Sequence, residues 1–276
     1  MTRQGWLWEG LLWVLAGVTF ALASTLPRTA ETRFDPSSRA TGAYRVMTWN
    51  VGISLDSGSG PLRAEHLDAV AATLAAAGPD LCFLQEVEGP GQARDLLRAL
   101  GSGWSSMLSE PHDGRHVLAL VRRPRARRMS ELDHVSGTLG VRVRTDAGHR
   151  IAAVGVHADA FSSQLRNRVL GSVVDALQDQ ATPLRFLLGD FNLDMDLDKR
   201  RDLFTDDQHR DVETYNFVAA ALQDAARDGG STAEPDRRLD YIFVSDDVTV
   251  LQAGPWPGRR QPGMDHDPVL ADLRLP

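Results

Sequence analysis

The stretch Leu187-Leu188-Gly189-Asp190-Phe191-Asn192 reads as the end of a buried strand that turns directly into a polar loop. The apolar residues before Gly189 are typical of a core strand, and the glycine lets the backbone turn sharply. Alternation along the strand puts Asp190 and Asn192 on one side. A carboxylate and a carboxamide at the carboxyl end of a strand can hold water, a metal ion or phosphate. An Asx turn without a ligand is the alternative.

The composition is that of a globular protein. The chain has 276 residues, of which 42% are hydrophobic and 24% charged, enough for one domain with a sizeable core. The formal net charge of −7 argues against a dedicated nucleic-acid binder, but it is compatible with an enzyme whose cleft is locally basic. The single cysteine, Cys82, lies in an apolar run and is expected in the core. An intrachain disulfide framework and a cysteine zinc site are therefore excluded.

The N-terminal segment, residues 1–27, differs from the remainder of the chain. Residues 10–26 carry no charge, but this run is short for a spanning helix, which needs about 20 apolar residues. Its length and the small residues of Ala21-Leu22-Ala23 suit a signal peptide, whereas Trp6, Trp8 and Trp13 suit an uncleaved membrane anchor. A buried soluble helix is a third interpretation. The first two predict an exported protein, secreted or periplasmic in one case and membrane-anchored through residues 6–26 in the other.

The remaining chain divides into a linker and one domain. Residues 28–43 are polar and are predicted to form the linker, and the domain is expected over residues 44–276. Helical spacing of apolar residues predicts helices over 63–77, 92–100, 162–178 and 216–227. Short apolar runs predict strands over 44–51, 81–87, 116–121, 139–143, 151–156, 184–188, 239–244, 248–252 and 269–275. This pattern predicts packed β-sheets flanked by helices.

Polar residues follow several predicted strands at the points where they end. They are Asn50, Glu86, His157, Asp190 with Asn192, Asp240, and the pair Asp265-His266. Taken singly, each is more simply explained by a solvated strand end or a surface histidine. Together they provide carboxylate and amide oxygens for a hard cation, and two histidines that can each pair with a carboxylate. This set suits metal-assisted attack of water on phosphorus and does not suit a serine or cysteine nucleophile.

Six motifs occur in order along the chain: TWN at 48–50, QEV at 85–87, VHAD at 156–159, GDFN at 189–192, RLDYIF at 238–243 and MDHDPV at 264–269. The series resembles the endonuclease/exonuclease/phosphatase family, which includes DNase I-like nucleases, apurinic endonucleases, inositol polyphosphate 5-phosphatases and sphingomyelinases. The resemblance covers the chain from about Tyr44 to the C-terminus. It implies an α/β (α+β) fold, a four-layer sandwich with two central, mostly antiparallel β-sheets flanked by helices. It also implies a magnesium-dependent phosphoesterase.

The resemblance further implies which residues hold the metal. Glu86 resembles the principal metal carboxylate of the family, and Asn50 resembles the amide that assists the metal or the phosphate. Asp265 resembles a carboxylate on the metal side, or one that supports the neighbouring histidine.

The catalytic roles are implied in the same way. His266 resembles the terminal histidine of the family, oriented and kept charged by Asp240. His157 resembles the histidine that contacts the phosphate oxygens. Asp190 resembles the residue that orients or deprotonates the attacking water, and Asn192 resembles one that steadies the phosphate.

The chain departs from the family pattern between the segments that contain Glu86 and His157. Family nucleases often carry a catalytic tyrosine there, but this interval has none, which counts against an apurinic endonuclease. The interval contains Arg115, which we expect to bind a substrate phosphate, with a solvated turn as the simpler alternative. Arg166, early in the helix after His157, is a second substrate-binding candidate, with a surface charge as the alternative.

Two further segments carry interpretable charge. The basic run over residues 122–128 could meet anionic lipid or a nucleic-acid backbone, although a solvated connection between strands is the simpler interpretation. Trp256, Arg259 and Arg260 precede the motif that contains His266, so they are expected to border the cleft and to affect specificity.

These observations predict a divalent-metal-dependent phosphoesterase that hydrolyses a phosphodiester by attack of an activated water on phosphorus. We expect Mg²⁺, with Mn²⁺ or Ca²⁺ as alternatives, and a monomer. The substrate can be a nucleic acid, a phospholipid or a small molecule, so a DNase-like endonuclease and a sphingomyelinase-like lipid phosphodiesterase are both candidates. A non-catalytic binding module is the alternative from another class, and the presence of Glu86, Asp190 and His266 argues against it.

Overall fold

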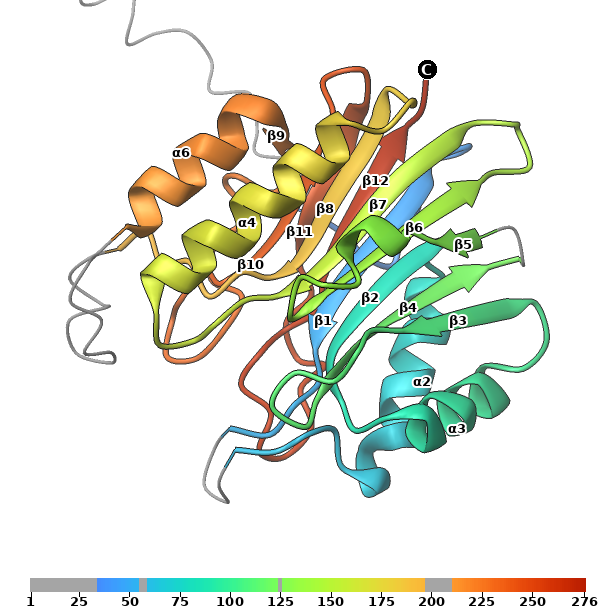
Figure 1. Ribbon diagram of the computed structural model, residues 1–276. Coiled ribbons are helices and arrows are strands. Elements are labelled where there is room, and N and C mark those ends of the chain that lie inside the picture. The colour runs from blue at the N-terminus through green and yellow to red at the C-terminus, as the bar shows by residue number, and fades with distance from the viewer. Residues whose placement is uncertain (1–33, 55–58, 124–125, 197–209) are drawn as a thin grey trace, which may run out of the picture. The chain divides into compact units, whose positions relative to one another are not determined.

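The computed structural model describes residues 34–54, 59–123, 126–196 and 210–276 (Figure 1). From Phe34 to Pro276 the chain forms one compact unit. The predicted signal peptide or anchor, residues 1–27, and the start of the predicted linker lie outside the described residues. None of the helices that are described has the length and apolar character needed to cross a membrane.

Two six-stranded β-sheets form the centre of the domain. The first has the order β11 (Thr249–Pro255), β12 (Val269–Arg274), β1 (Tyr44–Asn50), β2 (Leu81–Val87), β4 (His116–Arg122) and β3 (Trp104–Leu108). The second has the order β5 (Ala126–Arg128), β6 (Thr138–Arg144), β7 (Arg150–His157), β8 (Leu184–Asp190), β10 (Asp240–Val244) and β9 (Gln223–Asp224). In each sheet one central pair is parallel, β1 with β2 and β7 with β8, and the other pairs are antiparallel.

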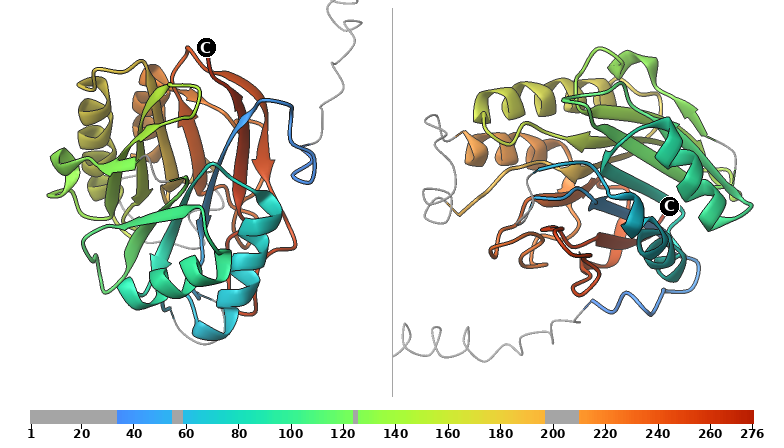
Figure 2. Two further views of the ribbon diagram at one scale, coloured as in Figure 1. Left: turned by 90° about the vertical axis from the view of Figure 1, so that its right-hand side faces the viewer. Right: turned by 90° about the horizontal axis from the view of Figure 1, so that it is seen from below.

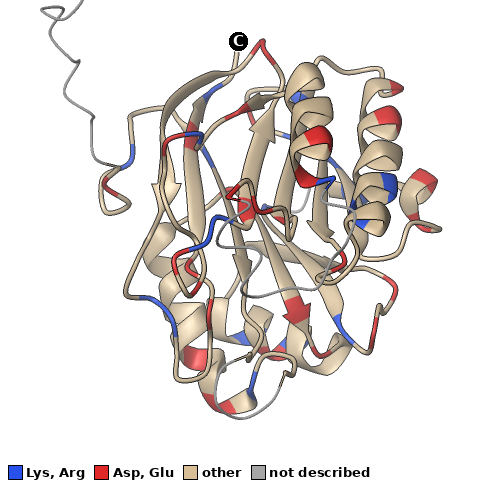
Figure 3. Cartoon of the chain, turned by 90° about the vertical axis from the view of Figure 1, so that its left-hand side faces the viewer, with Lys and Arg blue, Asp and Glu red and all other residues tan. Residues whose placement is uncertain are grey.

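Helices cover the outer faces of both sheets, so the predicted four-layer α/β sandwich is confirmed (Figure 2). The helices of the first sheet are η1 (Ala64–His66), α2 (Leu67–Ala77) and α3 (Pro90–Leu100). Those of the second are η2 (Ser130–Leu132), α4 (Ser163–Gln178) and α6 (Asp211–Ala221). One buried apolar cluster fills the space between the sheets, and two more lie between each sheet and its helices. Basic and acidic segments are interspersed over the side of the domain drawn in Figure 3.

Local sequence explains where the two crossover helices begin and end. In α2, Val70 and Leu74 are buried against the first sheet, and Gly78 ends the helix in the left-handed conformation that favours glycine. In α4, the hydroxyl of Ser162 caps the helix by accepting a hydrogen bond from the Leu165 N–H at 3.2 Å. The side chain of Leu165 itself is exposed, and the buried apolar face of α4 includes Leu170, Val173 and Leu177.

The structure corrects three local predictions, all at sheet edges. The helix predicted over residues 216–227 is wrong in its bounds, because α6 ends at Ala221 and Gln223–Asp224 form the edge strand β9. The edge strands β3 and β5 are also absent from the prediction. Edge strands contact the core on one side only, and the partly buried residues of β3 lack the apolar run that marks a central strand.

The domain was predicted to begin at residue 44, but residues 34–43 of the predicted linker already pack against it. A buried arginine holds them there. Arg45 in β1 donates hydrogen bonds to the carbonyl oxygens of Pro36 (2.9 Å) and Ser38 (2.8 Å). Its guanidinium also makes two hydrogen bonds to the buried carboxylate of Asp272 in β12, at 2.6 and 2.8 Å. This ion pair therefore ties the entering chain to the centre of the first sheet.

Removing the partner of that arginine should destabilise the domain. We expect Asp272→Ala to lower the free energy of unfolding by about 3–5 kcal/mol, because it leaves the Arg45 charge buried without a counterion. Urea titration followed by circular dichroism measures the loss. Asp95→Ala, which removes an exposed partner of Arg98, is the control and should cost at most about 1 kcal/mol. Equal losses in the two variants would contradict the assigned role.

Candidate active site

The carboxyl ends of the parallel strand pairs bring the predicted residues to one edge of the sandwich. Asn50 ends β1 and Glu86 lies in β2, while His157 ends β7 and Asp190 ends β8. The amide Nδ2 of Asn50 donates hydrogen bonds to Glu86 Oε1 and to Asp190 Oδ2, each at 3.0 Å. Because Asn50 and Asp190 belong to different sheets, this amide joins the two halves of the site. Its oxygen accepts the backbone N–H of Gly52 at 2.9 Å.

Glu86 is held in an unusual backbone conformation at the centre of this edge. Its φ is +63°, in the region that side-chain-bearing residues seldom adopt, and its carboxylate is almost fully buried. Oε2 accepts a hydrogen bond from Arg115 at 2.5 Å, and His157 Nε2 lies 3.5 Å from Oε1. A Cβ at Gly52 would lie 2.1 Å from Oε2, so only glycine leaves room for this carboxylate.

Strand β8 turns sharply at Gly189, as the sequence predicts. Gly189 has a φ of +152°, and a Cβ there would lie 2.0 Å from the carbonyl oxygen of Val156 in the neighbouring strand. Asp190 Oδ1 accepts the backbone N–H of Asn192 at 2.9 Å, which is an Asx turn. The turn leaves Oδ2 facing the cluster. The Asn192 amide donates to the carbonyl oxygen of Ala158 at 2.9 Å, so it ties the loop after β8 to the loop after β7.

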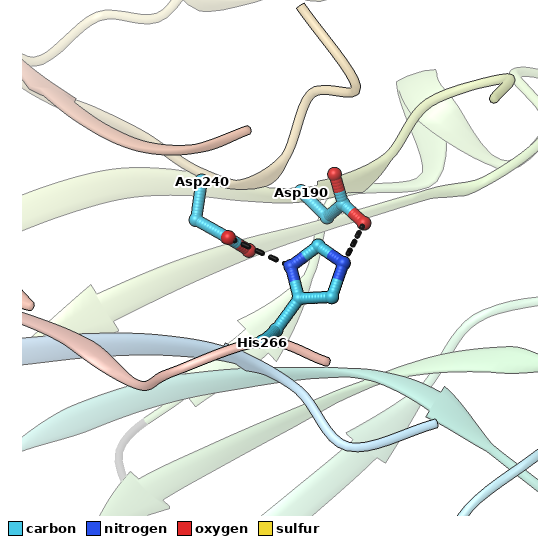
Figure 4. A group of neighbouring side chains, drawn as sticks. All are labelled: Asp190, Asp240 and His266. Carbon is cyan, nitrogen blue, oxygen red and sulfur yellow. Dashed lines mark hydrogen bonds and ion pairs between the residues drawn. The ribbon is translucent and has the colours of Figure 1, made fainter. Parts of the chain in front are cut away.

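His266 lies between two aspartates (Figure 4). Its Nδ1 is 2.8 Å from Asp240 Oδ2, and its Nε2 is 3.7 Å from Asp190 Oδ2. The hydroxyl of Thr232 donates to the same Asp240 oxygen at 2.7 Å. The indole N–H of Trp49 donates to the backbone carbonyl of His266 at 3.1 Å. The ring is thereby fixed in position from both sheets.

His266 is held in its charged form. Burial lowers the pKa of an imidazole, but the carboxylates of Asp240 and Asp190 outweigh burial and raise the pKa of His266 to about 10. Burial also raises the pKa of Asp240 to about 6, against the opposing effect of His266. Between these values Asp240 is ionised and His266 protonated, so Nε2 presents an N–H toward Asp190 at neutral pH.

The residues beside His266 form a further set of ion pairs. Asp265 Oδ1 lies 3.9 Å from His266 Nε2, which matches the histidine-supporting alternative more closely than a separate metal position. The next residue, Asp267, accepts a hydrogen bond from Arg260 at 2.5 Å, and Arg260 also pairs with Glu234 at 2.5 Å. Arg260 was expected to border the cleft, and it braces the loop that carries His266.

The two arginines expected to bind substrate lie in different surroundings. Arg115 contacts Glu86 and the Ser59 hydroxyl, and its side chain is 21% exposed, so it lies at the open side of the cluster. Arg166 is buried in α4 and donates to Asp211 Oδ1 at 3.0 and 2.8 Å. Asp211 also accepts the backbone N–H of Asp194 at 3.0 Å. Arg166 therefore supports the loop after β8, and its hydrogen-bonded guanidinium is directed at α6.

Some residues that shape the site have no signal in the sequence. Thr232 orients Asp240 and accepts the backbone N–H groups of Leu239 and Asp240, both at 3.0 Å. Threonine is common in loops, and its partner follows it by eight residues, so no spacing rule identifies it. Gly52 lies two residues after the end of the TWN motif, and its role becomes evident only when the position of Glu86 is known.

Two parts of the cluster have donors suitable for a cation. Asp190, Asp240 and His266 offer ligand atoms that lie within 4.8 Å of one another. However, a protonated imidazole has no free lone pair, so His266 cannot act as a ligand in its charged form. Glu86, with Asn50 beside it, offers carboxylate and amide groups whose oxygen atoms suit a hard cation. The second arrangement is the better metal site on chemical grounds.

The fold and the edge cluster define an α/β-sandwich protein with a buried group of carboxylates and a histidine at one edge of its two sheets. The profile of the Endonuclease/Exonuclease/phosphatase family matches residues 47–261, so the chain belongs to this family. No curated protein sequence matches it significantly. Members of the family are hydrolases that act on phosphoester bonds.

Solved structures have the same fold at low sequence identity. A family member from Bacteroides vulgatus has a TM-score of 0.64 and 16% identity, over 85% of this chain and 99% of its own. The catalytic domain of human Nocturnin, solved with a sulfate anion, has a TM-score of 0.63 and 18% identity, over 85% and 94%. A mannosyl-6-phosphatase from Bacteroides thetaiotaomicron has a TM-score of 0.60 and 16% identity, over 84% and 99%.

The charge state of His266 can be tested without knowledge of a substrate. Asp240→Asn should lower the pKa of His266 from about 10 toward the ordinary value of about 6.5, because one of the two carboxylates that favour the cation is removed. NMR titration of the ring protons measures this, with the resonance assigned from His266→Gln. Asp95→Asn, at an exposed position, is the control. An unchanged pKa in Asp240→Asn would contradict the arrangement.

The same shift has a consequence for stability. Because the pKa of His266 is raised on folding, protonation of this histidine contributes stability that is fully present below its unfolded pKa of about 6.5. That contribution is lost as the pH rises through about 10.

Proposed function

We propose that the protein is a divalent-metal-dependent phosphoesterase that hydrolyses a phosphodiester by attack of an activated water on phosphorus. The observation that carries the proposal is the position of Asp190 Oδ2. This atom accepts a hydrogen bond from Asn50 at 3.0 Å and lies 3.7 Å from His266 Nε2 and 3.9 Å from His157 Nε2. A carboxylate between two imidazoles is a proton acceptor beside two groups able to bind phosphate oxygens.

The charge of the cluster supports a cation bound at Glu86. Among the described residues, the charged partners of the carboxylates are Arg115 and protonated His266, against the four groups of Glu86, Asp190, Asp240 and Asp265, so negative charge is in excess. Oxygen ligands and excess negative charge suit Mg²⁺, with Mn²⁺ or Ca²⁺ as alternatives. Glu86 would be the carboxylate ligand. A bound divalent cation would offset charge on the phosphate and acidify water.

The residues of the chain then have separate tasks in the reaction. Asp190 Oδ2 accepts a proton from the attacking water, and the Asx turn with Asn192 fixes the carboxylate while it does so. His266, kept charged by Asp240, donates Nε2–H to a phosphate oxygen as negative charge develops. His157 is the more exposed of the two histidines, which suits it to contact with an incoming phosphate.

The substrate is proposed only as a chemical class. Similar structures include Nocturnin and a mannosyl-6-phosphatase, so the fold does not select between nucleic acid, phospholipid and small molecules. A DNase-like endonuclease and a sphingomyelinase-like enzyme stay as alternatives. A non-catalytic binding module is disfavoured because Glu86, Asp190 and His266 are all present and mutually connected.

We also propose an exported monomer. The support is the uncharged, apolar run at residues 10–26, which suits a signal peptide or an N-terminal membrane anchor. The cellular location of the protein then decides which phosphodiesters reach it.

Activity should depend on the residues of the edge cluster. Asp190→Asn and His266→Gln should each lower kcat on bis(p-nitrophenyl) phosphate by a factor of about 100 or more, because proton transfer or charge stabilisation at phosphorus is lost. A substrate panel of plasmid DNA, RNA, sphingomyelin and inositol phosphates, with and without Mg²⁺, identifies the natural class. Near wild-type rates in either variant would refute the mechanism.

Two controls keep this test interpretable. Unfolding curves of both variants should remain cooperative, which separates lost chemistry from lost structure. Glu86→Gln should raise the metal concentration needed for half-maximal rate, because an amide is a weaker ligand than a carboxylate.

Arg115 is proposed to bind a phosphate oxygen of the substrate. It contacts Glu86 at the exposed side of the cluster, and a guanidinium there can transfer its hydrogen bonds from the carboxylate to an incoming phosphate. Arg115→Ala should raise KM about tenfold or more, since hydrogen bonds to charged groups contribute about 1.5–3 kcal/mol. The metal concentration that gives the half-maximal rate should not rise in this variant. Arg98→Ala, an exposed change on α3, is the control, and an unchanged KM in Arg115→Ala would refute the role.

A further inference from the structure

The hairpin between β6 and β7 lies at the edge opposite the active site. Strand β7 runs for eight residues from Arg150 at this hairpin to His157 in the catalytic cluster. At about 3.3 Å per residue, the two ends are about 23 Å apart. Figure 1 shows the hairpin at the end of the sandwich where the C-terminus also lies.

This opposite edge is rich in arginine. One pocket of about 580 Å³ is lined by Arg127, Arg142, Arg144 and Arg150. A second, of about 460 Å³, is lined by Arg39, Arg122, Arg123 and Arg144, together with His149. The two pockets share Arg144 and Val143, so they belong to one surface. We call it the arginine face and define it by Arg39, Arg122, Arg123, Arg127, Arg142, Arg144 and Arg150.

The positive charge of the arginine face is only partly compensated. Three members have carboxylate partners: Arg39 with Asp80, Arg123 with Asp146, and Arg142 with Glu131. For Arg122, Arg127, Arg144 and Arg150, no carboxylate of the described residues lies within ion-pair distance, and all four side chains are exposed. Four exposed guanidinium groups without a carboxylate partner among the described residues, on a chain of net charge −7, are a local reversal of its overall charge. A surface of this kind attracts phosphate groups.

The location of the arginine face favours lipid phosphates over nucleic acid. The nucleotides held there would lie about 23 Å from the catalytic residues, so the face itself could not present their phosphodiester bonds for cleavage. The chain also enters the domain beside this face, because Arg39, Gly42 and Ala43 line its second pocket. Upstream lies the apolar run of residues 10–26, joined to the described domain through residues 27–33. Seven extended residues reach up to about 24 Å, long enough to let the face meet the same membrane.

We propose that the arginine face docks on a bilayer of anionic phospholipids, with the active-site edge turned away from the membrane. Basic side chains near an anionic surface each add to binding, and salt weakens that binding. The orientation has a consequence for the proposed enzyme. A site that faces the aqueous phase acts on a soluble phosphodiester, so docking in this way disfavours a lipid of the same membrane as substrate.

The experiment measures binding of residues 34–276 to vesicles of phosphatidylglycerol and phosphatidylcholine by co-sedimentation. This part of the chain is one compact unit that contains both sheets and all three buried clusters, and it lacks the apolar segment. We expect salt-sensitive binding to phosphatidylglycerol and none to phosphatidylcholine alone. The triple variant Arg127→Gln, Arg144→Gln, Arg150→Gln should bind at least tenfold more weakly. Its rate on bis(p-nitrophenyl) phosphate should be unchanged, which separates this proposal from the catalytic one.

A matched variant tests whether position or total charge decides the outcome. Arg94→Gln, Arg168→Gln, Arg227→Gln removes the same charge from exposed arginines on α3, on α4 and after β9. It should bind vesicles like the wild type. Equal weakening in both triple variants, binding to neutral vesicles, or no binding to phosphatidylglycerol would overturn the proposal. So would duplex DNA that binds the same face more tightly than the vesicles do. If the first triple variant unfolds, Arg144→Gln alone supplies the test.

Discussion

The hydrogen bonds of one buried amide hold the two halves of this site together. Asn50 donates to Glu86 within its own sheet and to Asp190 in the other, at 3.0 Å in both cases. Such an amide can bridge two carboxylates only if both sheets present their parallel strand ends at the same edge. The packing of the sheets, filled by the apolar cluster between them, is therefore the condition on which the chemistry depends.

The sequence predicts the centre of this arrangement better than its periphery. Central strands are apolar runs that end in a polar residue, so the strand ends that carry Glu86, His157 and Asp190 could be located in advance, whereas the four-layer fold was implied by the family resemblance of the motifs. Edge strands such as β3 contact the core on one face and lack that pattern. Arg166 could not be placed because its partner, Asp211, lies 45 residues further along the chain. A contact between residues so far apart in the chain produces no local sequence pattern from which it could be predicted.

The two edges of the sandwich carry opposite charge. At one edge, carboxylates outnumber their charged partners around Glu86 and Asp190, which suits a cation. At the other, Arg144 and Arg150 are exposed and have no carboxylate partner in the part of the chain that the structure describes, which suits phosphate. β7 connects them, with an arginine at its first residue and a histidine at its last. The site proposed for catalysis and the surface proposed for docking therefore lie at opposite ends of the same strand.

The central claim is that the edge cluster activates water for attack on phosphorus. Hydrolysis of bis(p-nitrophenyl) phosphate in H₂¹⁸O with Mg²⁺ tests it most directly, by mass spectrometry of both products. The account predicts one ¹⁸O atom in p-nitrophenyl phosphate and none in p-nitrophenol, because the bond that breaks is between phosphorus and oxygen. Label in p-nitrophenol, or no hydrolysis of this or any other phosphodiester with any divalent cation, would contradict it.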